Sequence, residues 1–392
     1  MTDPSESETG SRYLELDLPS GSVPLGFARE GPALYLVGRD RAARWPVQIL
    51  REGAARVRID GRLLAGSVDL VTEPPERERV LQIFRNRYGP RDFDRWYASP
   101  SRVLRVTLGG RPRAGRTSDH YHEWLRAEFD NVATDYDRHI TGNRINRLLR
   151  DRSLAELRRA FRTSRRLLEI GCGSGMETLP LLEEGHELVC IDISSRMLEV
   201  VREKARRAGV AERLETVHTA AAALPELAAR WGPGSFDGAY STYGALNCEE
   251  HLDPILPALA GLLRPGTPLV AGVYNRYCLF EMVGYGLTGR WARATGRTRR
   301  PMPVGSSRFC VDVFALSVSG FHKQVARWFE VERVEGVPVV LPPSDLARYT
   351  ERFARGFDRL ARWDLALGQR WPFRLFGDHF LMTLRRRQEP GG

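Results

Sequence analysis

The stretch LLEIGCGSGM, residues 167–176, decides the fold. Its first four residues are mostly apolar, which is typical of a buried strand. The next five alternate glycine with small residues, and a glycine backbone can turn with positive φ and approach a ligand closely. The stretch therefore predicts a strand that runs into a glycine turn and then a helix, which is where open α/β sheets bind nucleotides.

The spacing of the three glycines separates two kinds of nucleotide site. A dinucleotide-binding turn has the pattern G-x-G-x-x-G, whose third glycine lies beneath the pyrophosphate. Here the pattern is G-x-G-x-G, at Gly171, Gly173 and Gly175, and position 176 is Met. A turn of this kind fits an adenosine ligand that carries no pyrophosphate.

Asp192 follows a second apolar strand and lies 21 residues after the first glycine. An acid at the carboxyl end of that strand is placed to accept hydrogen bonds from both ribose hydroxyls of an adenosine. We then expect Ile193 and Met197 to pack on the adenine. The alternative is a helix-capping aspartate, although Ser194-Ser195 follow and compete for that role. The spacing of strand, turn and acid favours the ribose role.

Short apolar segments alternate with helix-length segments through the rest of the chain, a pattern that predicts a doubly wound parallel sheet. The predicted fold class is α/β, a Rossmann-like seven-strand doubly wound sheet preceded by a small split β-barrel domain. A helix over Tyr121–Leu149 comes before the sheet, and a helix containing 346–353 and 357–363 separates its last two strands. The predicted strands are 167–170, 187–191, 214–217, 236–240, 268–274, 329–338 and 379–384.

The part of the chain before the sheet has its own organisation. Residues 1–20 are rich in Ser, Glu and Asp and are expected to be a disordered tail. A small β domain follows at 21–108, a linker at 109–118 (GGRPRAGRTS), and the sheet domain at 119–387. Within the β domain we expect strands at 33–37, 47–50, 57–59, 63–71 and 103–108, the hairpin signal Asp60-Gly61, and a helix opened by Pro74-Pro75.

Three further motifs accompany the glycine turn and Asp192: FDNVATDYD at 129–137, FDGAY at 236–240 and LLRPGT at 262–267. Together they resemble the class I S-adenosylmethionine-dependent methyltransferases, most closely the branch of ubiquinone and menaquinone biosynthesis enzymes. The resemblance implies a sheet with an antiparallel last hairpin and S-adenosylmethionine as cofactor. Because the charge of a sulfonium disperses during methyl transfer, the chemistry demands no metal. The residues that the resemblance implies in cofactor binding are Tyr136, Glu169, Gly171, Cys172, Gly173, Gly175, Asp192, Ile193, Met197, Thr219, Ala220 and Ser241.

One departure from that family concerns HTAAAAL, residues 218–224. Many relatives have an acid here that hydrogen-bonds the adenine amino group. We expect backbone groups or Thr219 to hold the adenine instead.

The small β domain resembles the FMN-binding split-barrel superfamily and its deazaflavin-dependent nitroreductase-like branch. The resemblance rests on RWPV at 44–47, ILREG at 49–53, Gly61-Arg62 and the helix end at 85–88 before Gly89. It implies a flavin or deazaflavin site. A barrel kept for docking or interaction, without a cofactor, is the equal alternative, because no phosphate-cradling glycine loop is present.

The net charge of +10 raises the question of a nucleic-acid partner. The cations are arginines apart from Lys204 and Lys323, and they are interleaved with acids, as on an ordinary solvated surface. Amino-methylating nucleic-acid enzymes usually have Asp/Asn-Pro-Pro-aromatic after the fourth strand, where this chain has STYG at 241–244, and no Pro-Cys dipeptide occurs. A nucleic-acid substrate is therefore the less favoured alternative.

The cysteines are widely spaced and odd in number, which predicts neither a disulfide framework nor a zinc site and favours the reducing cytoplasm. No apolar run approaches the ~18–20 residues that span a bilayer, and the N-terminus lacks the pattern of a signal peptide. Peripheral membrane contact stays open.

Methyl transfer from a sulfonium is an in-line displacement, to which positioning alone contributes on the order of 7–11 kcal/mol. A general base is needed only where the acceptor must lose a proton. The candidates beyond the fourth and fifth strands are Tyr243, His251, His322 and Tyr274, and for each the alternative is a packed or surface side chain.

Residues 276–320, inserted after the fifth strand, are expected to build the acceptor surface. An apolar face is followed by arginines, which suggests either a lid over an acceptor with an anionic group or an ordinary amphipathic helix with a solvated loop. These residues are Leu279, Phe280, Met282, Val283, Tyr285, Leu287, Arg290, Arg293, Arg297, Arg299 and Arg300.

The predicted function is methylation of a small, apolar or aromatic molecule. The alternatives are a bifunctional or flavin-dependent oxidoreductase that works through the barrel, a nucleic-acid methyltransferase, and a protein that binds the cofactor without turnover.

Overall fold

The computed structural model describes residues 12–18, 21–38, 45–96, 102–110, 117–299, 302, 311–344, 346–347, 350 and 356–388. These residues form two compact units, which divide between Glu128 and Phe129, inside helix α4 (Thr117–Val132). The division lies after the linker expected at 109–118. A buried ion pair explains why most of α4 joins the first unit: Nη2 of Arg102 lies 3.0 Å from Oε1 of Glu128.

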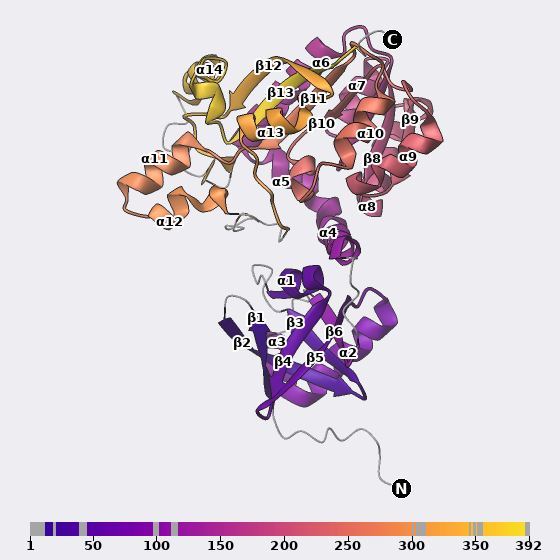
Figure 1. Ribbon diagram of the computed structural model, residues 1–392, viewed down its shortest axis with the longest axis vertical. Coiled ribbons are helices and arrows are strands. Elements are labelled where there is room, and N and C mark those ends of the chain that lie inside the picture. Colours follow the sequence, from indigo (N-terminus) through magenta and orange to yellow (C-terminus); the bar gives the residue numbers. More distant parts are fainter. Residues whose placement is uncertain are drawn as a thin grey trace. The chain divides into compact units, whose positions relative to one another are not determined.

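The first unit is a closed six-strand barrel with the strand order β1-β2-β3-β6-β5-β4 (Figure 1). Antiparallel pairing of β1 with β4 closes it. Its interior is filled by apolar side chains such as Leu16, Leu34 and Leu104, which are fully buried. The strands are β1 (Tyr13–Leu18), β2 (Gly21–Glu30), β3 (Ala33–Gly38), β4 (Ala54–Ile59), β5 (Arg62–Leu70) and β6 (Arg102–Leu108), and the helices are α1 (Trp45–Glu52), α2 (Pro74–Tyr88) and α3 (Pro90–Trp96).

The barrel confirms the predicted architecture and corrects two of its details. Residues 13–18, which we expected to lie in the disordered tail, form β1. Residues 47–50, expected as a strand, lie in α1. Among the described residues of α1, Trp45, Pro46, Ile49 and Leu50 are buried, and a spacing of four to five places them on one helical face, which a short apolar run does not reveal. A flavin site in the barrel stays a prediction.

The second unit contains the predicted seven-strand sheet in the order β12-β13-β11-β10-β7-β8-β9. β13 is antiparallel to both β11 and β12, whereas the other pairs are parallel, so the expected antiparallel last hairpin is confirmed. The strands are β7 (Arg166–Ile170), β8 (Glu187–Asp192), β9 (Leu214–His218), β10 (Gly238–Ser241), β11 (Pro268–Tyr274), β12 (Phe329–Val337) and β13 (His379–Arg386).

Helices cover both faces of this sheet (Figure 1). One apolar cluster joins the sheet to α9, α10 and α13, and another joins it to α6, α7 and α8. β7 contributes to both, because Leu168 and Ile170 face the first cluster and Leu167 faces the second. The helices are α5 (Tyr136–Thr141), α6 (Arg144–Ala160), α7 (Thr178–Glu183), α8 (Ser195–Arg207), α9 (Leu224–Trp231), α10 (Ile255–Leu262), α11 (Leu279–Leu287), α12 (Trp291–Ala294), α13 (Val318–Val325) and α14 (Phe357–Gly368).

The helix expected over Tyr121–Leu149 is several helices. α4 is followed by a 3-10 turn, by α5 and then by α6. The break before α6 has a capping cause: Oδ1 of Asn143 accepts the backbone N–H groups of Ile145 at 2.9 Å and Asn146 at 3.2 Å. Of the predicted C-terminal helix, 357–363 lie in α14, and most of 346–353 falls outside the described residues.

Asp364 of α14 holds the chain that leaves β12. Its buried carboxylate accepts the backbone N–H groups of Val339 at 3.0 Å, Val340 at 2.6 Å and Leu341 at 2.8 Å. We expect Asp364→Ala to leave these three buried N–H groups without an acceptor. The free energy of unfolding should fall by about 3 kcal/mol. Asp358→Ala, at an exposed position of the same helix, should change it by less than about 0.5 kcal/mol. Denaturant unfolding of both variants checks this, and equal stabilities would contradict it.

Candidate active site

The buried carboxylate of Asp192 organises the turn between the two central strands. The N–H of Gly173 donates to Oδ2 of Asp192 at 2.7 Å, and the N–H of Ser194 donates to Oδ1 at 2.8 Å. Asp192 is 8% exposed. The turn after β7 and the end of β8 are therefore joined through one side chain.

The cap of α8 separates the two interpretations of Asp192. The N-cap is Ser194, whose Oγ accepts the N–H of Met197 at 3.0 Å. Asp192 stands outside the helix and keeps lone pairs for a ligand. Burial raises the pKa of Asp192 to about 6, although the two backbone donors oppose the shift. The charge of this carboxylate therefore changes close to neutral pH.

The glycines of the turn differ in what surrounds them. A Cβ on Gly175 (φ +78°) would lie 2.2 Å from Cγ2 of Val201, and one on Gly171 would lie 2.3 Å from Cβ of Ala245. A Cβ on Gly173 (φ +53°) would meet only Cε1 of Tyr136, at 3.9 Å. Two of the glycines are thus required by packing, whereas the third leaves space for a ligand.

Residues 129–137 pack against the glycine turn, while the role of Tyr136 over the cofactor stays a prediction. Oγ of Ser174 donates to Oδ1 of Asp137 at 2.5 Å. Oδ1 of Asp130 accepts the hydroxyl of the α8 cap at 2.6 Å. These two hydrogen bonds hold Tyr136 beside Gly173.

Three of the predicted cofactor residues support the turn from within the core. Glu169 is 2% exposed and accepts from Oγ1 of Thr178 at 2.5 Å and from Sγ of Cys190 at 3.2 Å. Burial raises the pKa of Glu169 to about 7. Cys172 is buried, and Ser241 is buried with its hydroxyl donating to the carbonyl of Ile170 at 2.9 Å.

The remaining predicted residues surround Asp192. Thr219 donates its N–H to the carbonyl of Asp192 at 3.0 Å, and Ala220 follows it at the end of β9. Ile193 is half-buried, whereas Met197 is 1% exposed and packs in the core.

Glu249 is an acid that the sequence analysis did not single out. It follows the 3-10 helix after β10, is 8% exposed, and accepts the N–H of Ala222 at 3.3 Å. Ala222 belongs to the segment in which relatives have their adenine-binding acid. The missing acid in 218–224 was the signal, but sequence alone did not show which residue lies nearby.

The structure separates the candidate bases. His251 is exposed, and His322 is exposed on α13. Tyr243 lies at the carboxyl end of β10 with φ +56°, and its hydroxyl donates to the carbonyl of Asn146 at 2.9 Å. Burial raises the pKa of Tyr243 well above its usual value. A phenol in this setting holds its proton and is poorly suited to act as a base.

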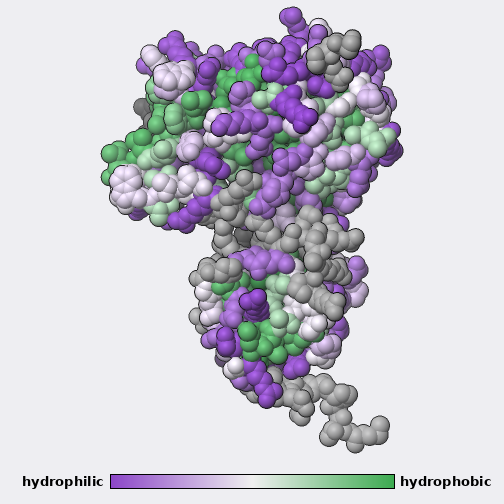
Figure 2. Space-filling model, viewed as in Figure 1, coloured by the Kyte–Doolittle hydropathy of each residue, from purple (hydrophilic) through white to green (hydrophobic). Residues whose placement is uncertain are grey.

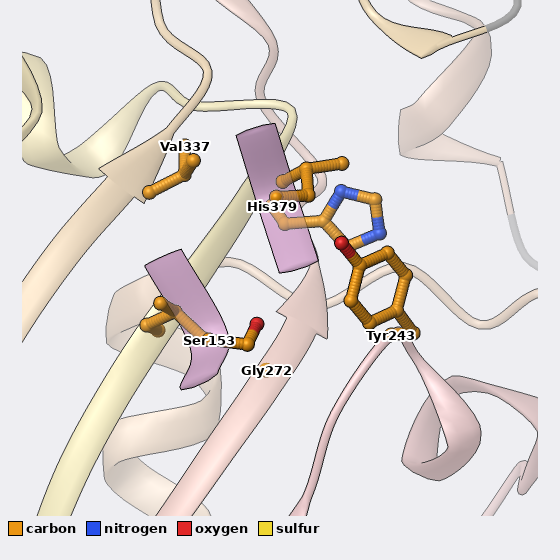
Figure 3. A pocket seen from close by; sticks show the side chains of 7 residues that line it. Ser153, Tyr243, Gly272, Val337 and His379 are labelled. Atoms are coloured by element: carbon orange, nitrogen blue, oxygen red, sulfur yellow. The ribbon is translucent and has the colours of Figure 1, made fainter. Parts of the chain in front are cut away.

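Tyr274 leads to a histidine that the sequence analysis missed. The rings of Tyr274 and His379 are perpendicular, with centroids 4.8 Å apart. Figure 3 shows the side chains of His379 and Tyr243 converging at the edge of a small cavity of a size for a single water molecule. The cavity is lined by Leu149, Ser153, Tyr243, Gly272, Val337, His379 and Leu381.

The expected acceptor surface is apolar but less basic than predicted. None of the residues of α11 is buried, and hydrophobic side chains reach the surface over it (Figure 2). Leu287 is 84% exposed and Trp291, at the start of α12, 68%. Arg297, expected on the basic face, is instead 4% exposed and forms ion pairs with Glu281 and Asp378, both at 2.6 Å. Arg300 lies outside the described residues.

Two structural features are absent from the described part of the chain. No group of three or more His, Cys, Asp or Glu there is arranged to hold a metal ion. No helix there is long and apolar enough to cross a membrane.

Part of this chain resembles known proteins. Residues 167–266 match the family described as "Methyltransferase domain". Demethylmenaquinone methyltransferase of Clavibacter sepedonicus is 32% identical over 151 residues, which are 37% of this chain and 56% of that protein. tRNA 5-carboxymethoxyuridine methyltransferase of Escherichia coli (strain K12) is 29% identical over 100 residues, 24% of this chain and 37% of that protein.

Among solved structures, 1,6-didemethyltoxoflavin-N1-methyltransferase of Burkholderia thailandensis is 17% identical with a TM-score of 0.41, over 68% of this chain and 91% of that one. The chain spans about a third to just over half of the length of the two curated relatives.

The packing of the glycines makes a prediction about stability. We expect Gly175→Ala to lower the free energy of unfolding by about 2–4 kcal/mol, because the new Cβ collides with Val201 in a left-handed backbone. Gly173→Ala should cost only about 1–2 kcal/mol, the price of the left-handed conformation alone. Thermal and denaturant unfolding of both variants measure the difference. Equal losses would contradict the distinction between a packed and an open glycine.

Proposed function

Since the second unit of the chain is a class I S-adenosylmethionine-dependent methyltransferase domain, we propose that this protein transfers a methyl group from S-adenosylmethionine to a small, apolar or aromatic acceptor. The observation that carries the proposal is the glycine turn folded around the buried carboxylate of Asp192. The space beside Gly173 and the lone pairs that Asp192 keeps beyond its two backbone hydrogen bonds fit a nucleoside.

Bound S-adenosylmethionine would supply an electrophilic methyl group on a sulfonium. Asp192 would accept the two ribose hydroxyls, and the backbone at Gly171 and Gly173 would contact the rest of the nucleoside. Tyr136 would close over the methionine end, because it lies on the open side of Gly173. The work of the protein is then to position two reactants and exclude water.

Glu249 is proposed to hold the adenine amino group in place of the acid that is absent from 218–224. Its carboxylate accepts the N–H of Ala222, in the 3-10 turn that follows β9, and it is shielded from solvent. A carboxylate can accept the backbone donor and the amino group together, since each oxygen has two lone pairs.

The acceptor is proposed to approach from α11 and α12. Their exposed apolar residues, Met282, Val283, Leu287 and Trp291, would be covered by an apolar or aromatic molecule. The E. coli relative is named for a tRNA nucleoside, and a nucleic-acid acceptor is the competing proposal. The interleaved charges of this chain favour the small molecule.

Calorimetric titration of S-adenosylmethionine tests the proposal at Asp192. We expect one saturable site in the wild type and at least a tenfold weaker site in Asp192→Asn, because one lost charge-assisted hydrogen bond is worth about 1.5–3 kcal/mol. Asp358→Asn, exposed on α14, should bind as the wild type does. Absence of binding to the wild type would overturn the proposed function.

The same titration has a pH dependence with a defined sign. The charged form of Asp192 accepts the ribose hydroxyls, and burial raises the pKa of this group to about 6 in the free protein. The dissociation constant should therefore be level above about pH 7 and rise towards tenfold per unit as the pH falls below about 6. A level profile through that range would exclude Asp192 as the ionised ligand.

Glu249 is tested by comparing two ligands that differ at one group. S-inosylhomocysteine lacks the adenine amino group of S-adenosylhomocysteine. The wild type should prefer S-adenosylhomocysteine by about tenfold or more, and Glu249→Gln should lose most of that preference. An unchanged preference in Glu249→Gln would mean that backbone groups or Thr219 hydrogen-bond the adenine amino group.

A further inference from the structure

An aspartate and a histidine that the cofactor site does not use lie together where β13 begins. Oδ2 of Asp378 and Nδ1 of His379 are 3.0 Å apart. Asp378 is 1% exposed and also accepts from Nη2 of Arg297 at 2.6 Å. Arg297 in turn pairs with Glu281 of α11 and stacks over Tyr274, 4.2 Å from the ring centroid. The imidazole is thus anchored through a chain of buried charges.

This arrangement selects one tautomer of the imidazole. Burial alone would raise the pKa of Asp378, but the charge of Arg297 and contact with His379 outweigh it and hold that pKa at about 2. An ionised carboxylate only accepts hydrogen bonds, so Nδ1 of His379 must carry the proton in the neutral ring. Nε2 then has a free lone pair, and no described residue hydrogen-bonds to it.

His379 lies at the same edge of the sheet as the glycine turn. It pairs with Tyr274, the last residue of β11, and the carboxyl ends of the parallel strands β7, β10 and β11 meet at one edge. Tyr243, just after β10, lies between the two features. Its ring centroid is 6.2 Å from that of His379, and the guanidinium of Arg150 lies 3.5 Å from its ring.

Arg150 completes the connection to the cofactor site. It forms an ion pair with Glu177, the residue before α7, which begins directly after the glycine turn. A continuous row of side chains therefore runs from the turn to the imidazole (Figure 3 shows its far end). The small cavity beside His379 is lined mainly by apolar side chains, among them Leu149, Val337 and Leu381.

We propose that His379 is the general base of the methyl transfer and that the acceptor is a hydroxyl group on an apolar or aromatic molecule. Asp378 is the positioning residue, which fixes the tautomer and the ring. This inference rests on the proposed function, because the base is needed only if a methyl group is transferred.

The step balances without any further reactant. The acceptor oxygen forms a bond to the methyl carbon as the carbon–sulfur bond breaks and its electron pair stays on sulfur. The proton of the hydroxyl passes to Nε2 of His379. The positive charge thus moves from sulfonium to imidazolium, where the carboxylate of Asp378 stabilises it.

The first experiment reads the tautomer and needs no acceptor. In ¹⁵N-labelled wild type, the His379 nitrogens should show a protonated Nδ1 and an unprotonated Nε2 at a pH where the ring is neutral. In Asp378→Asn this preference should weaken. The charged and titratable groups that face the ring are Asp378, Arg297, Tyr274 and Tyr243. A wild-type ring protonated at Nε2 overturns the proposal.

The second experiment compares acceptors that do and do not need a base. S-adenosylhomocysteine formation is measured with p-cresol, catechol and hydroquinone, and with p-nitrophenol assayed above its own pKa. His379→Gln should lower kcat/KM for the un-ionised phenols by at least about 100-fold. For the ionised nitrophenol the loss should stay below about threefold, since no proton remains to be removed.

The matched control is His186→Gln, a half-buried histidine at the amino end of β8, whose Nδ1 contacts the carbonyl of Ser164 at 3.0 Å. It should leave all rates unchanged. Equal losses for both classes of phenol in His379→Gln would assign the histidine to packing and overturn its role as base. Tight S-adenosylmethionine binding without turnover of any hydroxylated probe would overturn the hydroxyl acceptor, whereas failure to bind the cofactor would overturn the proposed function itself.

Discussion

A carboxylate buried at the end of β8 needs hydrogen-bond donors, because burying it unpaired costs several kcal/mol. Asp192 obtains them from the backbone N–H groups of Gly173 and Ser194. To deliver the first of these, the chain after β7 must turn with positive φ at Gly171, Gly173 and Gly175. Residues 129–137 pack on the resulting surface, so one side chain shapes the whole region that is proposed to hold the cofactor.

Short-range chemistry made this half predictable from the sequence. The spacing of strand, glycine turn and acid depends on the local backbone conformation alone. The sequence patterns also predicted all seven strands of the sheet correctly. The errors arose where tertiary packing overrides a local pattern. Residues 47–50 have a strand-like apolar run yet form a helix, because Trp45, Ile49 and Leu50 share a buried face. The long helix before the sheet was interrupted by a capping asparagine at 143.

The acceptor half was not predictable in the same way, because its residues meet only through the sheet topology. On the cofactor side the same holds for Glu249, which lies 27 positions from Ala222, and on the acceptor side Arg297 reaches Asp378 across 81 positions. The adjacent pair Asp378-His379 carries no recognisable motif. Its proposed role becomes visible only in the fold, where β13 pairs with β11 and the imidazole lies against Tyr274. Arg297, which the sequence placed on a basic surface, is required inside to neutralise two acids.

That buried arginine links two parts of the acceptor side. Glu281 belongs to α11 and Asp378 precedes β13, and one guanidinium pairs with both. Moving α11 away would remove the carboxylate of Glu281 from Arg297. Arg297 would then interact more strongly with Asp378 and compete with His379 for that carboxylate. The position of the exposed apolar helix and the hydrogen bond that orients the imidazole are therefore coupled through a single charge. A molecule bound against α11 would therefore change the orientation of His379 without contacting it.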